Sequence, residues 1–165
     1  MSLSERAEWL ELLLQSKISE FNEWRFSNLT VRPDISEMDF SNRDMSGAAL
    51  NGVRCVRTNF SGSNLSNTNL VQAEMTSCTF NGANLTDALL MYCNLKKSTF
   101  LNAILTRTNF MWADLTESDF TGSAMTRTVF VEAKLQGAKL EDIKKDIVYL
   151  KFANLEGTRW AALHE

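Results

Sequence analysis

The chain has 165 residues, of which 44% are hydrophobic and 22% charged, and its formal net charge is −3. This length is typical of one domain, and the apolar content is sufficient for a core of its own. The charge is nearly balanced and no basic stripe is present, so we expect no nucleic-acid partner. No apolar run approaches the length of a membrane span, and we expect no membrane association.

The first 25 residues predict an N-terminal helical cap. Ser2 and Glu5 have the spacing of a capping box. Apolar residues then recur at steps of three or four, the period of an amphipathic helix, and Gln15 and Ser16 mark a candidate break between two helices. We expect these helices to cover the open end of the segment that follows; the alternative is a helix that binds a partner.

Two further expectations concern this N-terminal region. Glu5, Glu8 and Glu11 interrupt its apolar residues, which is not typical of a secretory signal peptide. We therefore expect a cytoplasmic protein. Residues 26–34, with the only proline at Pro33, are the predicted connection to the next segment.

An apolar residue occupies every fifth position from Ile35 to Leu140, for twenty-two consecutive positions. A period of five fits neither an α-helix nor a β-strand. Sustained repetition at a fixed short period instead predicts a solenoid, in which each unit buries its apolar face only against its neighbours. The residue two positions earlier is usually small, as at Ala48 and Ser63, so each unit sends one large and one small side chain inward.

A longer period of twenty residues lies within this series, because phenylalanine recurs at every fourth unit. Four units would then form one four-sided coil, and like residues would stack from coil to coil. Aromatic rings stacked in this way bury a large area and prefer offset contacts. The predicted fold is an all-β solenoid of about 20 residues per coil over residues 35–140, with a core ladder of Phe40, Phe60, Phe80, Phe100, Phe120 and Leu140.

Several units resemble the A-(D/N)-L-x-x repeat of the pentapeptide-repeat family. Examples are Ala83-Asn84-Leu85-Thr86-Asp87, Ala113-Asp114-Leu115-Thr116-Glu117 and Ala153-Asn154-Leu155-Glu156-Gly157. The resemblance implies a right-handed quadrilateral β-helix. It also implies one specific activity to consider, since some members of this family imitate DNA with an acidic cylinder and inhibit DNA gyrase.

The repeat falters at residues 141–147, where Lys145 occupies a position that should be buried. Because a buried lysine is costly, we expect this segment to bulge or to form a short helix. The spacing of Leu140, Ile143, Ile147 and Leu150 favours the helix. Residues 141–165 would thus hold an irregular segment, a last partial coil and a C-terminal cap around Trp160 and Leu163.

No arrangement of residues predicts catalysis, and we expect no enzyme, no cofactor, no metal and no small-molecule substrate. The only histidine, His164, lies one residue from the end, so neither a histidine base for a nucleophile nor a Cys/His metal site is indicated. The three cysteines all occupy inward positions, which predicts buried structural thiols: Cys55, Cys78 and Cys93.

One side of the predicted coil carries apolar residues where solvent-facing positions should be polar. Exposed Met, Tyr and Trp are typical of interfaces. We therefore predict a non-catalytic, rigid protein-interaction module that forms a homodimer or binds another protein through this side. The alternative is that the N-terminal helix or residues 141–147 cover it. The candidate interface consists of Val71, Leu89, Met91, Tyr92, Met111, Trp112, Val129, Val131 and Tyr149.

The alternative function follows from the family resemblance: a DNA-mimicking modulator of DNA gyrase or topoisomerase. Such mimicry requires a dense negative field. From Val31 to Leu140, however, ten acidic residues are matched by ten basic residues. The near-neutral cylinder therefore favours the interaction module over the DNA mimic.

Overall fold

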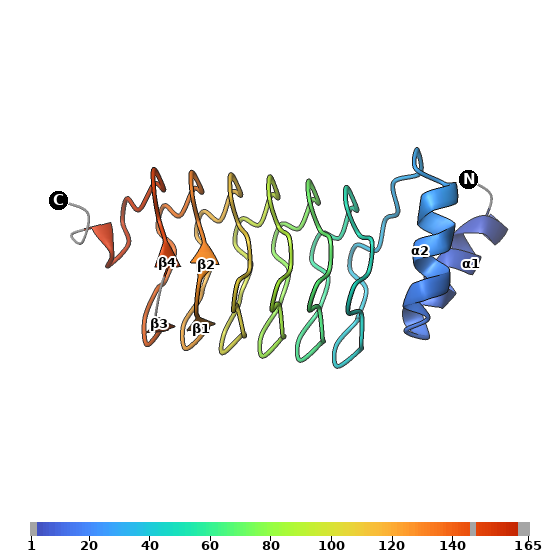
Figure 1. Cartoon of the computed structure of the whole chain (residues 1–165), viewed down its shortest axis with the longest axis horizontal. Helices are drawn as coiled ribbons and strands as arrows, with labels where there is room; N and C mark the ends of the chain where they lie inside the picture. The colour runs from blue at the N-terminus through green and yellow to red at the C-terminus, as the bar shows by residue number, and fades with distance from the viewer. Residues whose placement is uncertain (1–2, 146–147, 162–165) are drawn as a thin grey trace.

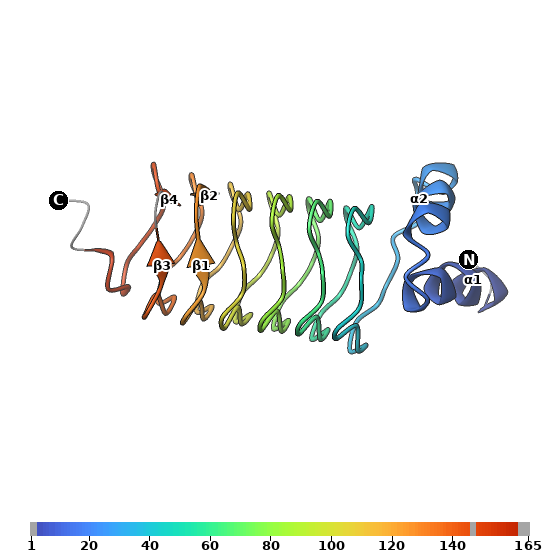
Figure 2. The ribbon, with the colours of Figure 1, turned by 60° about the horizontal axis from the view of Figure 1, so that its bottom comes forward.

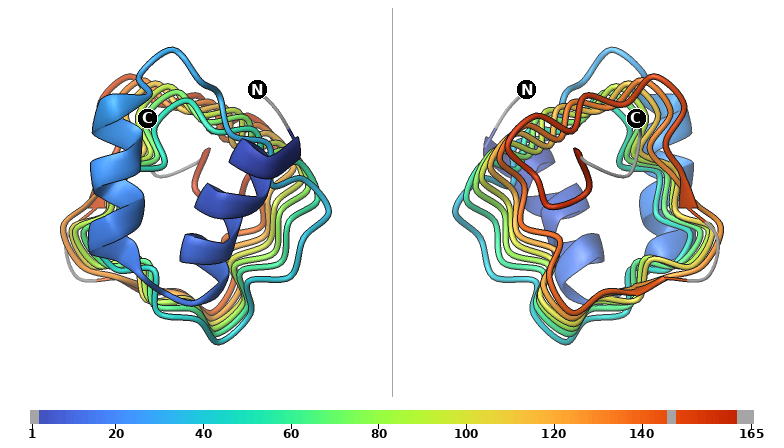
Figure 3. Two further views of the ribbon diagram at one scale, coloured as in Figure 1. Left: turned by 90° about the vertical axis from the view of Figure 1, so that its right-hand side faces the viewer. Right: turned by 90° about the vertical axis from the view of Figure 1, so that its left-hand side faces the viewer.

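A computed structural model describes residues 3–145 and 148–161 of the chain. Most of the molecule is a row of stacked coils, with two helices at the N-terminal end and the C-terminus at the other (Figure 1). The same row is seen when the molecule is turned (Figure 2). Viewed along the row, successive coils lie nearly over one another and enclose a common interior (Figure 3). The chain is therefore a β-solenoid.

Parallel pairing between coils holds the row together. Isolated β-bridges join residues that are twenty apart, from Asp34↔Arg54 to Lys134↔Asn154. Towards the C-terminus the bridges lengthen into two-residue strands. β1 (Ala124–Met125) pairs with β3 (Lys144–Lys145), and β2 (Thr128–Val129) pairs with β4 (Val148–Tyr149). The bridges thus repeat at the spacing of the phenylalanines in the sequence.

Each unit of five ends in a tight turn that the repeated sequence explains. The N–H of Ser63 donates to the carbonyl of Phe60 at 3.1 Å, and Gly62 between them has a φ of +66°. Positive φ at the third residue is what a type II turn requires. Glycine suits this corner, because a Cβ on Gly62 would lie 2.4 Å from Oδ1 of Asn42 in the preceding coil and would require that side chain to move.

The Asn or Asp of each unit stabilises the turn that follows it. Oδ1 of Asn64 accepts the backbone N–H of Ser66 at 3.2 Å, and Oδ1 of Asp114 accepts that of Thr116 at 3.2 Å. Short polar side chains favour such turns because they bond the backbone two residues on. Nδ2 of Asn64 also donates to Asp44 in the preceding coil at 3.1 Å. The same residue type therefore forms the corner and ties one coil to the next.

A ladder of stacked rings fills the interior. Phe100 lies between Phe80 and Phe120, with centroids 4.9 and 4.7 Å away and planes within 6°. Phe110 and Phe130 form a second stack, 5.2 Å apart, and Phe110 meets Phe100 edge-on at 83°. These rings are fully buried. The predicted ladder residues Phe40, Phe60 and Leu140 are buried as well.

Two helices precede the coils. α1 (Leu3–Leu14) and α2 (Ile18–Ser27) are separated by a short break that includes Ser16, with a φ of 55°, where the sequence suggested one. Viewed along the row, α1 lies across the interior and α2 along the rim (Figure 3). Neither helix in the described part of the chain is long and apolar enough to cross a bilayer.

Buried Arg25 joins α2 to the first coil. Its guanidinium donates to the carbonyls of Val31 at 2.8 Å, Asn51 at 3.1 Å and Ala49 at 3.2 Å. Asn22 adds two bonds, from Nδ2 to the carbonyl of Gly47 at 3.0 Å and from the N–H of Ala49 to Oδ1 at 2.8 Å. The helices are thus attached to the end of the solenoid.

The prediction of a helix or bulge at residues 141–147 is wrong for the described part of that segment. β3 pairs with β1 in the same twenty-residue register as the coils before it, so residues 141–145 are not irregular. Strand pairing satisfies the backbone N–H and C=O groups of both coils, whereas a helix here would leave those of the preceding coil without partners. Ile147 and the side chain of Lys145 lie outside the described residues. Of the two predicted cap residues, Trp160 is buried and Leu163 lies outside the described residues.

Candidate protein-interaction surface

The nine predicted interface residues lie on one side of the solenoid, in three parallel rows; we call this set the apolar face. Bridges place Leu89, Asn109, Val129 and Tyr149 in the first row, one residue per coil. The second row contains Val71, Met91, Met111 and Val131, and the third contains Tyr92 and Trp112. The N–H of Tyr92 donates to the carbonyl of Met111 at 3.1 Å, and that of Trp112 to Val131 at 3.1 Å.

Exposure differs between the rows. Tyr92 is 52% exposed, Tyr149 47%, Trp112 41% and Leu89 38%. The residues of the second row and Val129 are half-buried. The exposed side chains of Leu89 and Tyr149 in the first row and of Tyr92 and Trp112 in the third therefore flank the less exposed second row.

Tyr92 and Trp112 stack on each other, with centroids 4.7 Å apart and planes within 10°. Both occupy the corner position of their unit, with φ values of 60° and 58°. Such a conformation is uncommon for bulky residues. Identical corners in successive coils direct the two side chains alike, and the coil spacing of about 4.8 Å suits ring stacking. The corner thus holds a rigid pair of aromatic rings in solvent.

The N-terminal helices do not cover the apolar face. Their contacts are with the connection and the first coil: Arg25 and Asn22 bond residues 47–51, and Arg43 donates to the carbonyl of Leu14. The alternative of helical cover is therefore wrong. Segment 141–145 is itself part of the coil row and does not fold over the face.

In the described part of the chain, four large apolar residues outside the nine are also exposed, among them Ile104 at 45%, which bridges Asn84 and Ala124 on another row. Phe152 occupies the same corner position two coils after Trp112, where the repeat register places it, and is 74% exposed. Phe26 and Leu29, at the end of α2 and in the connection, are 74% and 73% exposed. No repeat covers this region, so the sequence contains no register that would predict their exposure.

Charged residues on the other rows pair along the solenoid. Arg107 Nε lies 2.6 Å from Asp87 Oδ1, and Arg54 lies 2.9 Å from Asp34 and 3.7 Å from Glu74. The Arg107 guanidinium holds the pKa of Asp87 below its usual value. Further pairs join Lys96 and Lys134 to Asp114, Lys97 to Glu117, and Lys139 to Asp119. Acidic and basic side chains therefore alternate, and these pairs interrupt any acidic stripe.

The cysteines are buried and free. Burial raises the pKa of the Cys55 thiol, and raises that of Cys93 to about 12. Cys78 and Cys93 donate to the carbonyls of Cys55 and Leu70 at 2.6 and 2.9 Å, as Thr108 does to Leu85 at 2.8 Å. Among the described residues, no group of His, Cys, Asp and Glu side chains is arranged to hold a metal ion.

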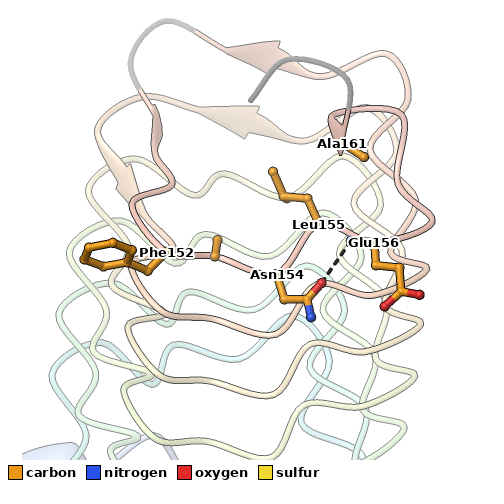
Figure 4. A pocket seen from close by; sticks show the side chains of 6 residues that line it. Phe152, Asn154, Leu155, Glu156 and Ala161 are labelled. Atoms are coloured by element: carbon orange, nitrogen blue, oxygen red, sulfur yellow. Dashed lines mark hydrogen bonds between the residues drawn. The ribbon is translucent and has the colours of Figure 1, made fainter. Parts of the chain in front are cut away.

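Two shallow cavities lie at the ends of the solenoid. A cavity of about 510 Å³ at the last coil is lined by residues 152–156 and Ala161. There Phe152 points outward, and the Oδ1 of Asn154 accepts the N–H of Glu156 at 3.0 Å (Figure 4). A second cavity, of about 400 Å³, lies between the connection and the first coils and is lined by Arg25, Leu29, Thr30, Val31, Arg32, Asn51, Gly52 and Gln72.

Known proteins share both the repeat and the fold. The family described as "Pentapeptide repeats" matches in 8 copies at residues 44–82, 54–90, 83–122 and 108–144. Among solved structures, HetL of the cyanobacterium Nostoc sp. strain PCC 7120, a pentapeptide repeat protein involved in heterocyst differentiation regulation, is 17% identical. The match covers 76% of this chain and 88% of HetL, with a TM-score of 0.55.

A second solved structure is QnrB1, a plasmid-mediated fluoroquinolone resistance protein, which is 18% identical. The match covers 76% of this chain and 70% of QnrB1, with a TM-score of 0.52. No curated protein sequence matches the chain. At these identities the two structures support the fold alone.

Proposed function

Because the chain belongs to the pentapeptide-repeat family, we propose that it is a non-catalytic, rigid module that binds a protein through its apolar face. The observation that carries this proposal is the exposed stack of Tyr92 on Trp112 beside half-buried Met91 and Met111. Aromatic residues and methionine are enriched in interface cores. Rigid rings also lose little conformational entropy when a partner binds.

The proposal includes the shape of the module. Bridges at a spacing of twenty residues, with four turns in each coil, support a right-handed quadrilateral β-helix of the family type. The position of α1 across the interior and the bonds of Arg25 support a capping role for the two helices. Such a cap would shield the first coil, whose edge would otherwise pair with other chains.

The DNA-mimic alternative receives less support from the site. Mimicry of a phosphate backbone needs closely spaced negative charge. In this solenoid Arg107 faces Asp87, and Arg54 lies between Asp34 and Glu74. Exposed pairs of this kind neutralise the field of the carboxylates around them. Binding to gyrase through negative charge is therefore the less favoured function.

The test compares Trp112→Asp with Asn67→Asp. Both positions are exposed corners of similar φ, at 58° and 57°, so the second variant controls for the added charge. Light scattering after size exclusion would report mass, and thermal unfolding would report folding. We expect both variants to fold and only Trp112→Asp to lose the partner, whether that is a second copy or another protein. Loss of folding in Trp112→Asp alone would show that the face is structural and would refute the proposal.

A further inference from the structure

The two ends of the apolar face differ in side-chain size. At the first coil its rows continue into Ala49, Asn51 and Gly52, and a Cβ added to Gly52 would meet nothing within 4 Å. At the last coil the same rows end in Tyr149, Lys151 and Phe152, of which Phe152 is 74% exposed. One end of the face is therefore recessed and the other protrudes.

The recessed end opens into the cavity of about 400 Å³ beside Gly52 and Gln72. Leu29 and Val31 provide an apolar wall on the side of the connection. Arg32 lies at the same cavity, and its guanidinium is 3.3 Å from Glu74, so its charge is partnered. The cavity thus has space for an aromatic side chain, with an apolar wall on one side and polar and cationic side chains, among them Arg25 and Arg32, on the others.

The second and third rows of the face are nearly symmetric about a point between Met91 and Met111. Going outward along the second row, each methionine is followed by a valine, Val71 on one side and Val131 on the other. The third row has Tyr92 and Trp112 at the equivalent places. A surface with this symmetry can meet a copy of itself through a two-fold axis.

We propose that the partner of the apolar face is a second copy of this chain, laid antiparallel against the first; this rests on the proposed function. The two-fold axis lies in the plane of the interface, between the coils of Met91 and Met111. It brings Met91 of one copy against Met111 of the other, and Val71 against Val131. It also places each Phe152 in the cavity beside Gly52 of the other copy.

The same arrangement matches several further positions, while in the first row it sets Leu89 against Asn109 and Val129 against Asn69. Tyr149 meets Ala49, so that a large residue again faces a small one. Gln72 meets Glu132, and Asn51 meets Lys151; both pairs can form a hydrogen bond to a charged group, and neither opposes like charges. All four of these polar residues are exposed on the face in the single chain.

A parallel arrangement fits the face less well. It would place each coil against the same coil of the other copy, and the first row against the third. Tyr149 would then meet Phe152 at one end of the face, and Ala49 would meet Gly52 at the other. The interface would then be crowded at one end and empty at the other. Val129 would also face Glu132, which buries a charge against an apolar side chain. Size and charge therefore favour the antiparallel pair.

The dimensions of the face predict a weak dimer. Five coil steps of about 4.8 Å and a width of four residues give roughly 24 Å by 10 Å before the cavity walls are added. Stable interfaces bury about 800 Å² on each partner. This face is smaller, so we expect a dimer that dissociates on dilution.

Disulfide trapping tests the register directly. In one chain Gln72 and Glu132 are three coils apart, about 14 Å, which is beyond the reach of a disulfide. In the antiparallel pair they face each other. The double variant Gln72→Cys/Glu132→Cys should therefore form a covalent dimer under mild oxidation. Each single variant should not, because its new cysteine faces the wild-type partner residue. If the double variant forms no more covalent dimer than the single variants do, the proposed register is overturned.

Charge variants measured by sedimentation equilibrium provide a second test. Gln72→Lys should strengthen the dimer several-fold by facing Glu132, and Gln72→Glu should weaken it several-fold. If Trp112→Asp weakens a wild-type dimer but neither Gln72 variant changes it, the antiparallel register is refuted and the proposed interface stands. A wild type that stays monomeric at millimolar concentration refutes the second copy as partner. The proposed function then stands or falls on whether Trp112→Asp abolishes capture of another protein.

Discussion

Replacement of Phe100 by Ala should destabilise the solenoid more than replacement of Phe40 by Ala. Both rings are fully buried, so each change removes a similar apolar area. Phe100, however, stacks on rings in both neighbouring coils and meets Phe110 edge-on at 5.7 Å, whereas Phe40 stacks only on Phe60, at 5.9 Å, among the described rings. Solenoid stability depends on such nearest-neighbour contacts.

The magnitude follows from these contacts. A buried Phe→Ala change costs about 3–5 kcal/mol, and each aromatic pair contributes about 0.5–1.5 kcal/mol beyond its buried area. Phe100 has two more ring partners than Phe40, so we expect its replacement to cost about 1–3 kcal/mol more.

Urea unfolding at 25 °C would measure the difference, with circular dichroism for the coils and tryptophan fluorescence for the ends. Phe26→Ala, at a 74% exposed position, is the control and should change the free energy of unfolding little. Equal losses for Phe100→Ala and Phe40→Ala would show that the rings act independently, and the ladder argument would be refuted.

Three further predictions follow from the fold. Arg25→Ala should cost about 2–3 kcal/mol, since it leaves four carbonyls without a charged donor. Hydrogen exchange should also rise across α2, whereas the exposed control Arg127→Ala should change neither quantity. The backbone N–H of Ser46 holds the pKa of Asp44 below its usual value. This contribution to stability is present above the unfolded pKa of about 3.9 and is lost as pH falls through the folded value. The free energy of unfolding should therefore fall in acid, less steeply in Asp44→Asn, whereas an unchanged slope would argue against the Ser46 bond. Because burial raises the pKa of Cys93 to about 12, native thiols should react with iodoacetamide only on unfolding; rapid labelling of the folded protein would contradict that burial.

The repeating part of the fold was predictable because one register fixes every inward position. Knowing that Phe60 and Phe80 are twenty residues apart is enough to place them in adjacent coils, and the same register places Tyr92 beside Trp112. The pattern also placed both rings at solvent-facing positions; it did not contain how far each ring is exposed, which depends on the corner φ and on the flanking rows. The apolar face could thus be located from sequence, but the differences in exposure among its residues could not.

The wrong prediction at residues 141–147 has a specific cause. Inward positions in this solenoid alternate at steps of three and two, as at Met45, Ala48 and Leu50. Leu140 and Ile143 are one such step of three, and this spacing is also that of a helix face. A short segment therefore cannot be assigned by its own period. The pairing of β3 with β1 decides it, because a coil below supplies bonds that the segment alone lacks.

The recessed end of the face could not be predicted from the repeat. Its cavity is formed where the non-repeating connection, through Leu29 and Val31, meets Gly52 and Gln72 of the first coils. A solenoid of identical coils would have no such end, and a copy could slide along it by one coil at little cost. In this chain the cavity at one end and Phe152 at the other are five coils apart. That distance selects one antiparallel register of the proposed dimer. The two ends of the face therefore determine how the copies align, and the regular middle supplies the affinity between them.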